Sequence, residues 1–264
     1  MDHHAKLRWA RKHFEALQAD IGRFMDAHPY ELRVRFDQKR QQYVAVLRAP
    51  KPLPRDWSLR LGDILHNTRS ALDSLVHALA AKQLGRLPSD DEARQIRFVI
   101  ADEPAAWTRE SERWLAHVSP EVRAKIETLQ PYHHPPVRYD HPLSVLRDLT
   151  RIDRHRHIAL VAEATSNGGV PIEGPGLRPG TQVTGWRGRF VTGSEIPVVD
   201  VKDGAGRQLQ PESRAEMRGT GRLCPEITFV EGPPGHGGSV AGFVTALHRH
   251  VMQDVFRVLD EWLD

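Results

Sequence analysis

The chain has 264 residues, of which 39% are hydrophobic, so it is long enough to bury a core. Its formal net charge of +3 is mildly basic, which suits an anionic partner and excludes a histone-like composition. No run of about 18 apolar residues occurs, so we expect no transmembrane helix, and the first residues lack the apolar stretch of a signal peptide. The single cysteine, Cys224, excludes an internal disulfide, and we expect a cytoplasmic protein.

Helical periodicity appears at both ends of the chain. Apolar residues recur at helical spacing over residues 3–26 and again over 240–263. Polar caps and prolines mark further helix starts, and the additional helices expected are about 58–82, 104–116, 119–130 and 143–154. Together these segments predict a core of five or six helices over 3–26, 58–155 and 240–263.

Strand signals fall in separate parts of the chain. ELRVRF and QQYVAVLR, within residues 31–48, alternate apolar and polar side chains and predict an N-terminal β-hairpin. FVI (98–100) predicts a short strand. Between about 158 and 230, glycine and proline separate short β-rich runs, which predict a small antiparallel insert. We therefore predict one α+β domain over residues 1–264, mainly helical, with this β-rich insert.

The helix GDILHNTRSALDSLVHALA (62–80) has an unusual polar face. Each of its short polar residues costs about 0.5 kcal/mol of helix propensity relative to alanine, because the side chain competes for backbone groups. Arg69 borders the face, and Asp73 lies one turn before His77, where a carboxylate can orient an imidazole. The face consists of Asp63, His66, Asn67, Ser70, Asp73, Ser74 and His77.

Three interpretations of this face stay open. It is a solvated surface, a buried hydrogen-bond network, or one wall of a polar cleft. Solvated helix faces normally use Glu, Lys, Gln and Arg, as the helix at 3–26 does, so we favour the cleft. The candidate catalytic residues are His66, Arg69 and Asp73, and the candidate binding residues are Asn67, Ser70 and His77.

A second polar cluster lies in RDLTRIDRHRHIAL (147–160). Its arginines fall on one helical face, which suits a phosphate or carboxylate that guanidinium groups bind bidentately, while a neighbouring histidine moves a proton. The alternative is a solvated basic helix end. The candidate catalytic residues here are Arg151, Asp153, His155 and His157, and the candidate binding residues are Arg147, Arg154 and, outside the cluster, Tyr132.

Three motifs stand out together: LHNTRSALDSLV (65–76), LQPY (129–132) and DRHR (153–156). They resemble the motifs of a family of uncharacterised bacterial proteins common in actinomycetes, which share patterns like LHNLRSALDHLV, LQPY and DKHR. The resemblance covers roughly residues 58–160 and carries no assigned activity. It implies that the two polar clusters belong to one functional unit. Ser74 stands where the family pattern often shows histidine.

The basic cluster is also similar to the motif of HEPN-type helical ribonucleases, which separates an arginine from a histidine of one helix by four to six residues. Five residues separate Arg151 from His157, whereas seven separate Arg69 from His77. This resemblance implies a metal-independent ribonuclease.

Other kinds of site have weaker signals. The loop PYHHPPVRYDHP (131–142) offers candidate metal ligands in His133, His134 and His141, but the chain has no paired ligand spacing such as HExxH or CxxC. It also has no GxSxG nucleophile elbow and no phosphate-binding glycine loop. We expect no cofactor.

Three functions follow from these patterns. The first is an HEPN-like metal-independent ribonuclease or phosphate-handling protein, in which arginines hold a phosphate, a histidine acts as general base, and Asp73 or Asp153 orients it. The second is a small-molecule enzyme or binding protein, with or without a metal, whose pocket for a small anionic ligand lies at the same place. The third is a non-catalytic interaction module that forms a homodimer. No membrane partner is expected in any of them.

Overall fold

The computed structural model confirms the α+β class. It describes residues 2–27, 31–40, 42–48, 52–134, 140–156, 158–165, 170–173, 182–184, 187–189, 195–197, 200–202, 217–219, 226–230 and 239–263. Where we expected one domain, the chain divides into two compact units. The helical unit comprises residues 1–18, 55–159 and 229–264, and the strand unit comprises 19–54 and 160–228.

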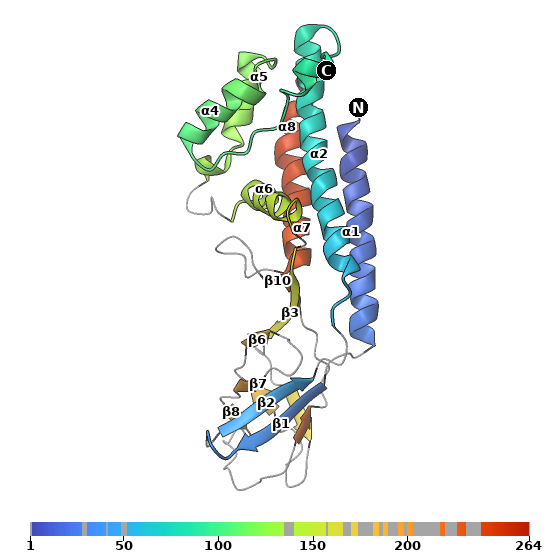
Figure 1. The fold of residues 1–264 in the computed structure, drawn as a ribbon, viewed down its shortest axis with the longest axis vertical. Helices are drawn as coiled ribbons and strands as arrows, with labels where there is room; N and C mark the ends of the chain where they lie inside the picture. The colour runs from blue at the N-terminus through green and yellow to red at the C-terminus, as the bar shows by residue number, and fades with distance from the viewer. Residues whose placement is uncertain are drawn as a thin grey trace. The chain divides into compact units, whose positions relative to one another are not determined.

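Three helices, from the first third and the end of the chain, form the frame of the helical unit (Figure 1). They are α1 (His3–Asp26), whose last residues count with the strand unit, α2 (Asp56–Leu84) and α7 (Val240–His250). After α7 the chain passes through a π-helical turn, Val251–Phe256, into α8 (Arg257–Asp260). The expected helix at 240–263 is therefore interrupted. Helix α2 is followed by Gly85, whose φ of 66° favours glycine.

Shorter helices pack on this frame. They are α3 (Asp90–Ala93), α4 (Pro104–Trp114), α5 (Pro120–Thr128), a 3-10 turn (Pro131–His133) and α6 (Pro142–Asp153). The predicted start of α5 is confirmed, because the Ser119 side chain accepts a hydrogen bond from the Val122 amide ahead of Pro120. Helix α6 contacts both α2 and α7 and lies across them in Figure 1.

The core of the helical unit is apolar and closely packed. Helix α2 supplies much of it, because its apolar side faces inward over its whole length, and α6 and α7 contribute further fully buried leucines and valines. Full burial of one such side chain stabilises the fold by about 1.5–3 kcal/mol. None of the helices in the described part of the chain is long and apolar enough to span a membrane.

The strand unit joins the predicted hairpin to the predicted insert. The hairpin consists of β1 (Glu31–Asp37) and β2 (Gln42–Arg48), which pair antiparallel with Glu31 opposite Arg48. Strand β9 (Met217–Gly219) pairs with β1, and β7 (Glu195–Pro197) pairs with β2, so strands of the insert flank both sides of the hairpin.

Two sheets result from these pairings. In the larger sheet the strand order is β7-β2-β1-β9-β4-β5-β8, completed by β4 (Val170–Glu173), β5 (Gln182–Thr184) and β8 (Asp200–Lys202). The smaller sheet has the order β10-β3-β6, with β3 (Leu160–Thr165), β6 (Arg187–Arg189) and β10 (Glu226–Phe229). Within the insert, β3 pairs antiparallel with β6, β4 with β5 and β9, and β5 with β8, as predicted.

Candidate functional site

A cleft of about 810 Å³ opens within the helical unit between α2, residues 97–103, α4 and α6. It brings together residues from both polar clusters of the sequence. From α2 come His66, Arg69 and Asp73, and from α6 and the residue after it come Arg147, Asp153 and Arg154. The structure thus places these six predicted residues on one concave surface.

One wall of the cleft is an extended segment that α2 holds in place. Arg69 Nη2 donates a hydrogen bond to the Phe98 carbonyl oxygen (2.5 Å), and the Phe98 amide donates to Asp73 Oδ1 (2.9 Å). Arg69 and Asp73 also form an ion pair of 3.2 Å with each other. Residues 98–100 therefore lie in no strand, and the predicted strand FVI is wrong. The Phe98 amide and carbonyl are hydrogen-bonded to side chains of α2 and not to a neighbouring strand.

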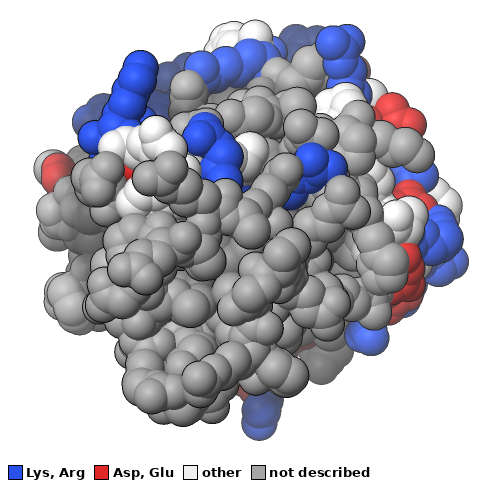
Figure 2. Space-filling model, turned by 90° about the horizontal axis from the view of Figure 1, so that it is seen from below, with Lys and Arg blue, Asp and Glu red and all other residues white. Residues whose placement is uncertain are grey.

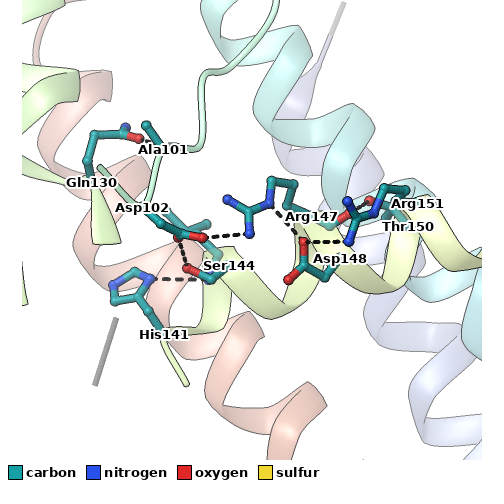
Figure 3. A network of polar contacts seen from close by, with 10 residues as sticks. Ala101, Asp102, Gln130, His141, Ser144, Arg147, Asp148, Thr150 and Arg151 are labelled. Atoms are coloured by element: carbon teal, nitrogen blue, oxygen red, sulfur yellow. Dashed lines mark hydrogen bonds and ion pairs between the residues drawn. The ribbon is translucent and has the colours of Figure 1, made fainter. Parts of the chain in front are cut away.

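The same segment is anchored on its other side by buried polar groups (Figure 3). The Gln130 side chain, which is fully buried, accepts from the Ala101 amide (2.8 Å) and donates to the Ile126 carbonyl (3.0 Å). Asp102 accepts from the Ser144 hydroxyl (2.6 Å) and pairs with Arg147 Nη2 (2.6 Å). These contacts give the glutamine of the LQPY motif a structural role.

Helix α6 approaches α2 closely at its C-terminal end. A Cβ atom at Gly62 would lie 2.7 Å from one carboxylate oxygen of Asp153 and 2.8 Å from the other. Glycine at this position of α2 therefore makes room for the Asp153 carboxylate. This contact places Asp153, the first residue of the DRHR motif, against α2 three residues before the LHN motif.

Five arginines and five carboxylates line the cleft, but they do not all neutralise one another. Besides the pairs of Arg69 and Arg147, Arg109 pairs with Glu110 (3.1 Å). In the described part of the chain, Arg97 and Arg154 have no carboxylate within ion-pair distance. The Arg97 guanidinium lies 4.2 Å from the centre of the Trp114 ring, and Arg154 Nε donates to the Thr150 carbonyl (3.4 Å).

His66 is exposed and is the one imidazole among the described residues that line the cleft. Neither Asp73 nor another described residue forms a hydrogen bond with it. Nor do the described residues show the expected contact between Asp73 and His77, because Asp73 is turned toward Arg69 and Phe98. Asp73 thus fixes the wall of the cleft, and it bonds to no histidine among the described residues.

Other predicted residues of α2 make contacts within the fold. The Ser70 hydroxyl accepts a hydrogen bond from Lys6 of α1. Asn67 donates to the Asp63 carbonyl (2.8 Å), and Ser74 donates to the Ser70 carbonyl (2.8 Å), which is the usual way for short polar side chains to bond inside a helix. Half-buried His77 does not line the cleft. Of these bonds, only the one from Lys6 to Ser70 joins this face to another helix.

Arg151, the arginine of the HEPN-like motif, is not brought into the cleft. Arg151 is 69% exposed, does not line the cleft, and lies 3.7 Å from Asp148 (Figure 3). His155 is exposed beyond the end of α6, and His157 lies outside the described residues. Tyr132 donates to Glu127 Oε1 (2.8 Å), and its pKa is raised chiefly by burial, so it too is engaged away from the cleft.

The three histidines considered as metal ligands have other surroundings. His133 packs against Tyr132 with the ring centres 4.2 Å apart, and exposed His134 stacks on His141 at 5.3 Å. His141 caps α6, because its Nδ1 accepts a hydrogen bond from the Leu143 amide (3.3 Å). Among the described residues, these three do not form a group with ligand atoms close enough for one metal ion.

The cap at His141 predicts acid sensitivity of the fold. The side chain is 6% exposed, and burial, followed by the nearby His250 and His134, lowers its pKa to about 3, against the opposing effect of Asp102 and Asp254. The unfolded chain binds this proton near pH 6.5, so stability is fully present above that pH and falls toward pH 3. The expected loss is at most about 1.4 kcal/mol per pH unit. Urea unfolding at pH 7 and pH 5 measures it.

A variant of His141 distinguishes the contribution of this cap to acid sensitivity from that of other titrating groups. Asn is a good helix cap that does not titrate, so His141→Asn is expected to lose less stability between pH 7 and pH 5 than the natural protein. His250, whose pKa is also lowered by burial, stays in both proteins. An equal loss in both proteins would show that His141 is not the acid-sensitive cap.

Sequence reasoning missed half of the cleft. Residues 97–103 and α4 contribute Arg97, Asp102, Arg109, Glu110 and Trp114. The concentration of Arg, Glu and Trp in WTRESERW (107–114) could have indicated a binding site, but the same pattern is equally typical of a solvated amphipathic helix. Comparisons of the chain with protein-family models, with curated proteins and with solved structures find no match.

Proposed function

We propose that the cleft binds a phosphate-bearing ligand, and that RNA is this ligand. The observation that carries the proposal is the pair Arg97 and Arg154, which line the cleft without a carboxylate partner among the described residues. Guanidinium groups bind phosphate oxygens through two parallel hydrogen bonds, and each such bond is stronger than a neutral one. An anion in the cleft would meet both groups.

The surroundings of Arg97 favour this role. Its guanidinium stacks on Trp114, whose indole nitrogen donates to Glu110 Oε2 (2.9 Å). A guanidinium held over an aromatic ring loses less conformational freedom when it binds a phosphate. Arg69 and Arg147 are paired with carboxylates of the cleft, whereas Arg97 and Arg154 have no carboxylate partner among the described residues.

The composition of the surface supports an anionic partner as well. On the face in Figure 2, Lys and Arg side chains of described residues are seen at more places than Asp and Glu. In the strand unit, Arg35, Lys39 and Arg40 are exposed. Such basic groups attract nucleic acid without selecting a site, so the tests below use controls with the same change of charge.

Metal-independent cleavage is the reaction that this cleft supports. His66 would take the proton from a ribose 2′-hydroxyl, and the resulting oxygen would attack the adjacent phosphorus. The bond from phosphorus to the 5′-oxygen breaks, which leaves a 2′,3′-cyclic phosphate and a 5′-hydroxyl after that oxygen takes up a proton. Arg97 and Arg154 would stabilise the charge that builds on the phosphate oxygens.

The test of this function uses purified protein and a labelled single-stranded RNA in the presence of EDTA. We expect binding that weakens steeply with salt, and slow cleavage to products that carry cyclic phosphate ends. Intact RNA after long incubation would contradict the cleavage, and binding no tighter than that of an unrelated protein of equal charge would contradict the whole proposal.

The size of the cleft favours a second candidate, a small phosphorylated molecule. A volume of about 810 Å³ falls within the range of about 300–1,000 Å³ usual for small-molecule pockets. Competition separates the two candidates. A mononucleotide that displaces RNA completely at low concentration favours the small ligand, whereas displacement only by longer RNA favours the polymer.

A further inference from the structure

The first and last helices of the chain meet at a cluster of three ionisable side chains. His3 Nε2 lies 2.8 Å from Asp260 Oδ1, and His4 Nε2 lies 2.9 Å from Asp260 Oδ2. The two adjacent histidines of α1 therefore share one carboxylate of α8, and each engages a different oxygen. Nearly the whole length of the chain separates the histidines from the aspartate.

The rings are held in place from one side. The His3 and His4 ring centres are 4.4 Å apart, and both rings meet buried Phe256 edge to face, at 4.9 and 5.1 Å. The side chains of His4 and Asp260 are 37% and 31% exposed, whereas that of His3 is 10% exposed. The cluster is thus backed by an aromatic ring and open to solvent on the other side.

We propose that His3, His4 and Asp260 form a binding site for a divalent transition-metal ion of the Zn²⁺ class. Imidazole nitrogen and carboxylate oxygen are ligands that Zn²⁺ prefers, and two histidines with one carboxylate leave a fourth position for water. Among the described residues, these three form the group whose ligand atoms all lie within 4.8 Å of one another.

The geometry needs only small side-chain rotations. Two ligand atoms on one tetrahedral Zn²⁺ lie about 3.3 Å apart, given bonds of about 2.0–2.2 Å. The nitrogen–oxygen distances of 2.8 and 2.9 Å are slightly shorter than this, so the hydrogen-bonded triad opens to admit an ion. Each neutral imidazole then carries its proton on Nδ1 and offers Nε2 to the metal.

Such an ion would join α1 to α8 and so stabilise the helical unit. An ion that binds the folded chain and not the unfolded chain raises stability in proportion to the logarithm of its concentration over its dissociation constant. The site does not belong to the cleft, since none of its three residues lines it. Its effect is measured by metal binding and melting temperature, and RNA binding enters neither readout.

The experiment uses full-length protein without a histidine tag. After EDTA treatment and dialysis, we expect one equivalent of Co²⁺ to give a visible d–d absorption, and Zn²⁺ to displace it and raise Tm. Asp260→Asn keeps the size and a hydrogen-bonding oxygen but loses the charge. Because even indirect partners of a metal change affinity by about 10–100-fold, this variant and His3→Ala are each expected to weaken Zn²⁺ binding at least about tenfold.

A second pair of adjacent histidines provides the matched control. His133 and His134 are exposed and are not part of the cluster, so a double alanine variant there is expected to bind Zn²⁺ as the natural protein does. Binding lost equally in this control and in Asp260→Asn would overturn the proposal. So would a Tm that Zn²⁺ leaves unchanged, in which case the triad is a hydrogen-bonded contact between two helices and no metal site.

Discussion

Replacing His66 with alanine is expected to lower the rate of RNA cleavage at least about 100-fold and to leave RNA binding little changed. His66 is exposed on α2, so the substitution removes no buried contact and should not perturb folding. Among the described residues that line the cleft, it is the only histidine. Single-turnover cleavage in EDTA and binding measured by fluorescence anisotropy give the two quantities separately.

The control for this prediction is His155→Ala. His155 is also exposed, but it lies beyond α6 and does not line the cleft. The natural rate is expected in this variant. The opposite result, with cleavage lost in His155→Ala and kept in His66→Ala, would shift the reaction to the DRHR segment and contradict the role of His66.

Removing Arg97 and Arg154 together is expected to weaken RNA binding about 100-fold or more. Hydrogen bonds to a charged group contribute about 1.5–3 kcal/mol each, and two guanidinium groups are lost. A total of about 3 kcal/mol corresponds to somewhat more than 100-fold in the dissociation constant. The dependence of log K on log salt should also become less steep by about 1.4 for a single-stranded ligand.

A double variant with the same loss of charge tests whether the effect is local. Arg94, directly after α3, and Arg151 of α6 are exposed and do not line the cleft. Arg94→Ala with Arg151→Ala should change binding far less than the cleft variant. An equal loss in the two double variants would mean that net charge and not the cleft binds RNA, and a larger loss in the second would favour the Arg151–His157 motif.

Much of the fold follows from local patterns of residues. The helices α1, α2, α4, α5 and α6 appear within a few residues of the expected bounds, because each has apolar residues at helical spacing. In α4, α5 and α6 a proline also marks the start. The hairpin at 31–48 was predicted by its alternation. The pairing of this hairpin with β7 and β9 was not predicted, because the sequence of a strand does not identify a partner strand more than a hundred residues away.

The π-helical turn at Val251–Phe256 illustrates a different limit. Its apolar residues keep a spacing that is compatible with an uninterrupted α-helix, so periodicity alone predicts one helix through 263. A π-turn is a local adjustment of hydrogen bonding that depends on what the helix packs against. Here the turn ends at Phe256, the ring on which His3 and His4 rest.

The candidate site was predicted in part. Six of the predicted residues line the cleft, three of them from the polar face of α2 and its border. Arg69 and Asp73 do not have the predicted catalytic roles, because both hydrogen-bond to the backbone of the extended segment 97–101. Such competition for a side chain depends on tertiary contacts that helical spacing does not contain.

The location of the bound RNA tests the central claim most directly. Arginine side-chain Nε–H resonances of ¹⁵N-labelled protein, followed during titration with single-stranded RNA, report each guanidinium separately. We predict that the resonances of Arg97 and Arg154 shift most, while those of Arg8 and Arg11 on α1 stay in place. Saturable shifts confined to the strand unit, at Arg35 and Arg40, with none at Arg97 and Arg154, would contradict the assignment of the cleft as the phosphate-binding site.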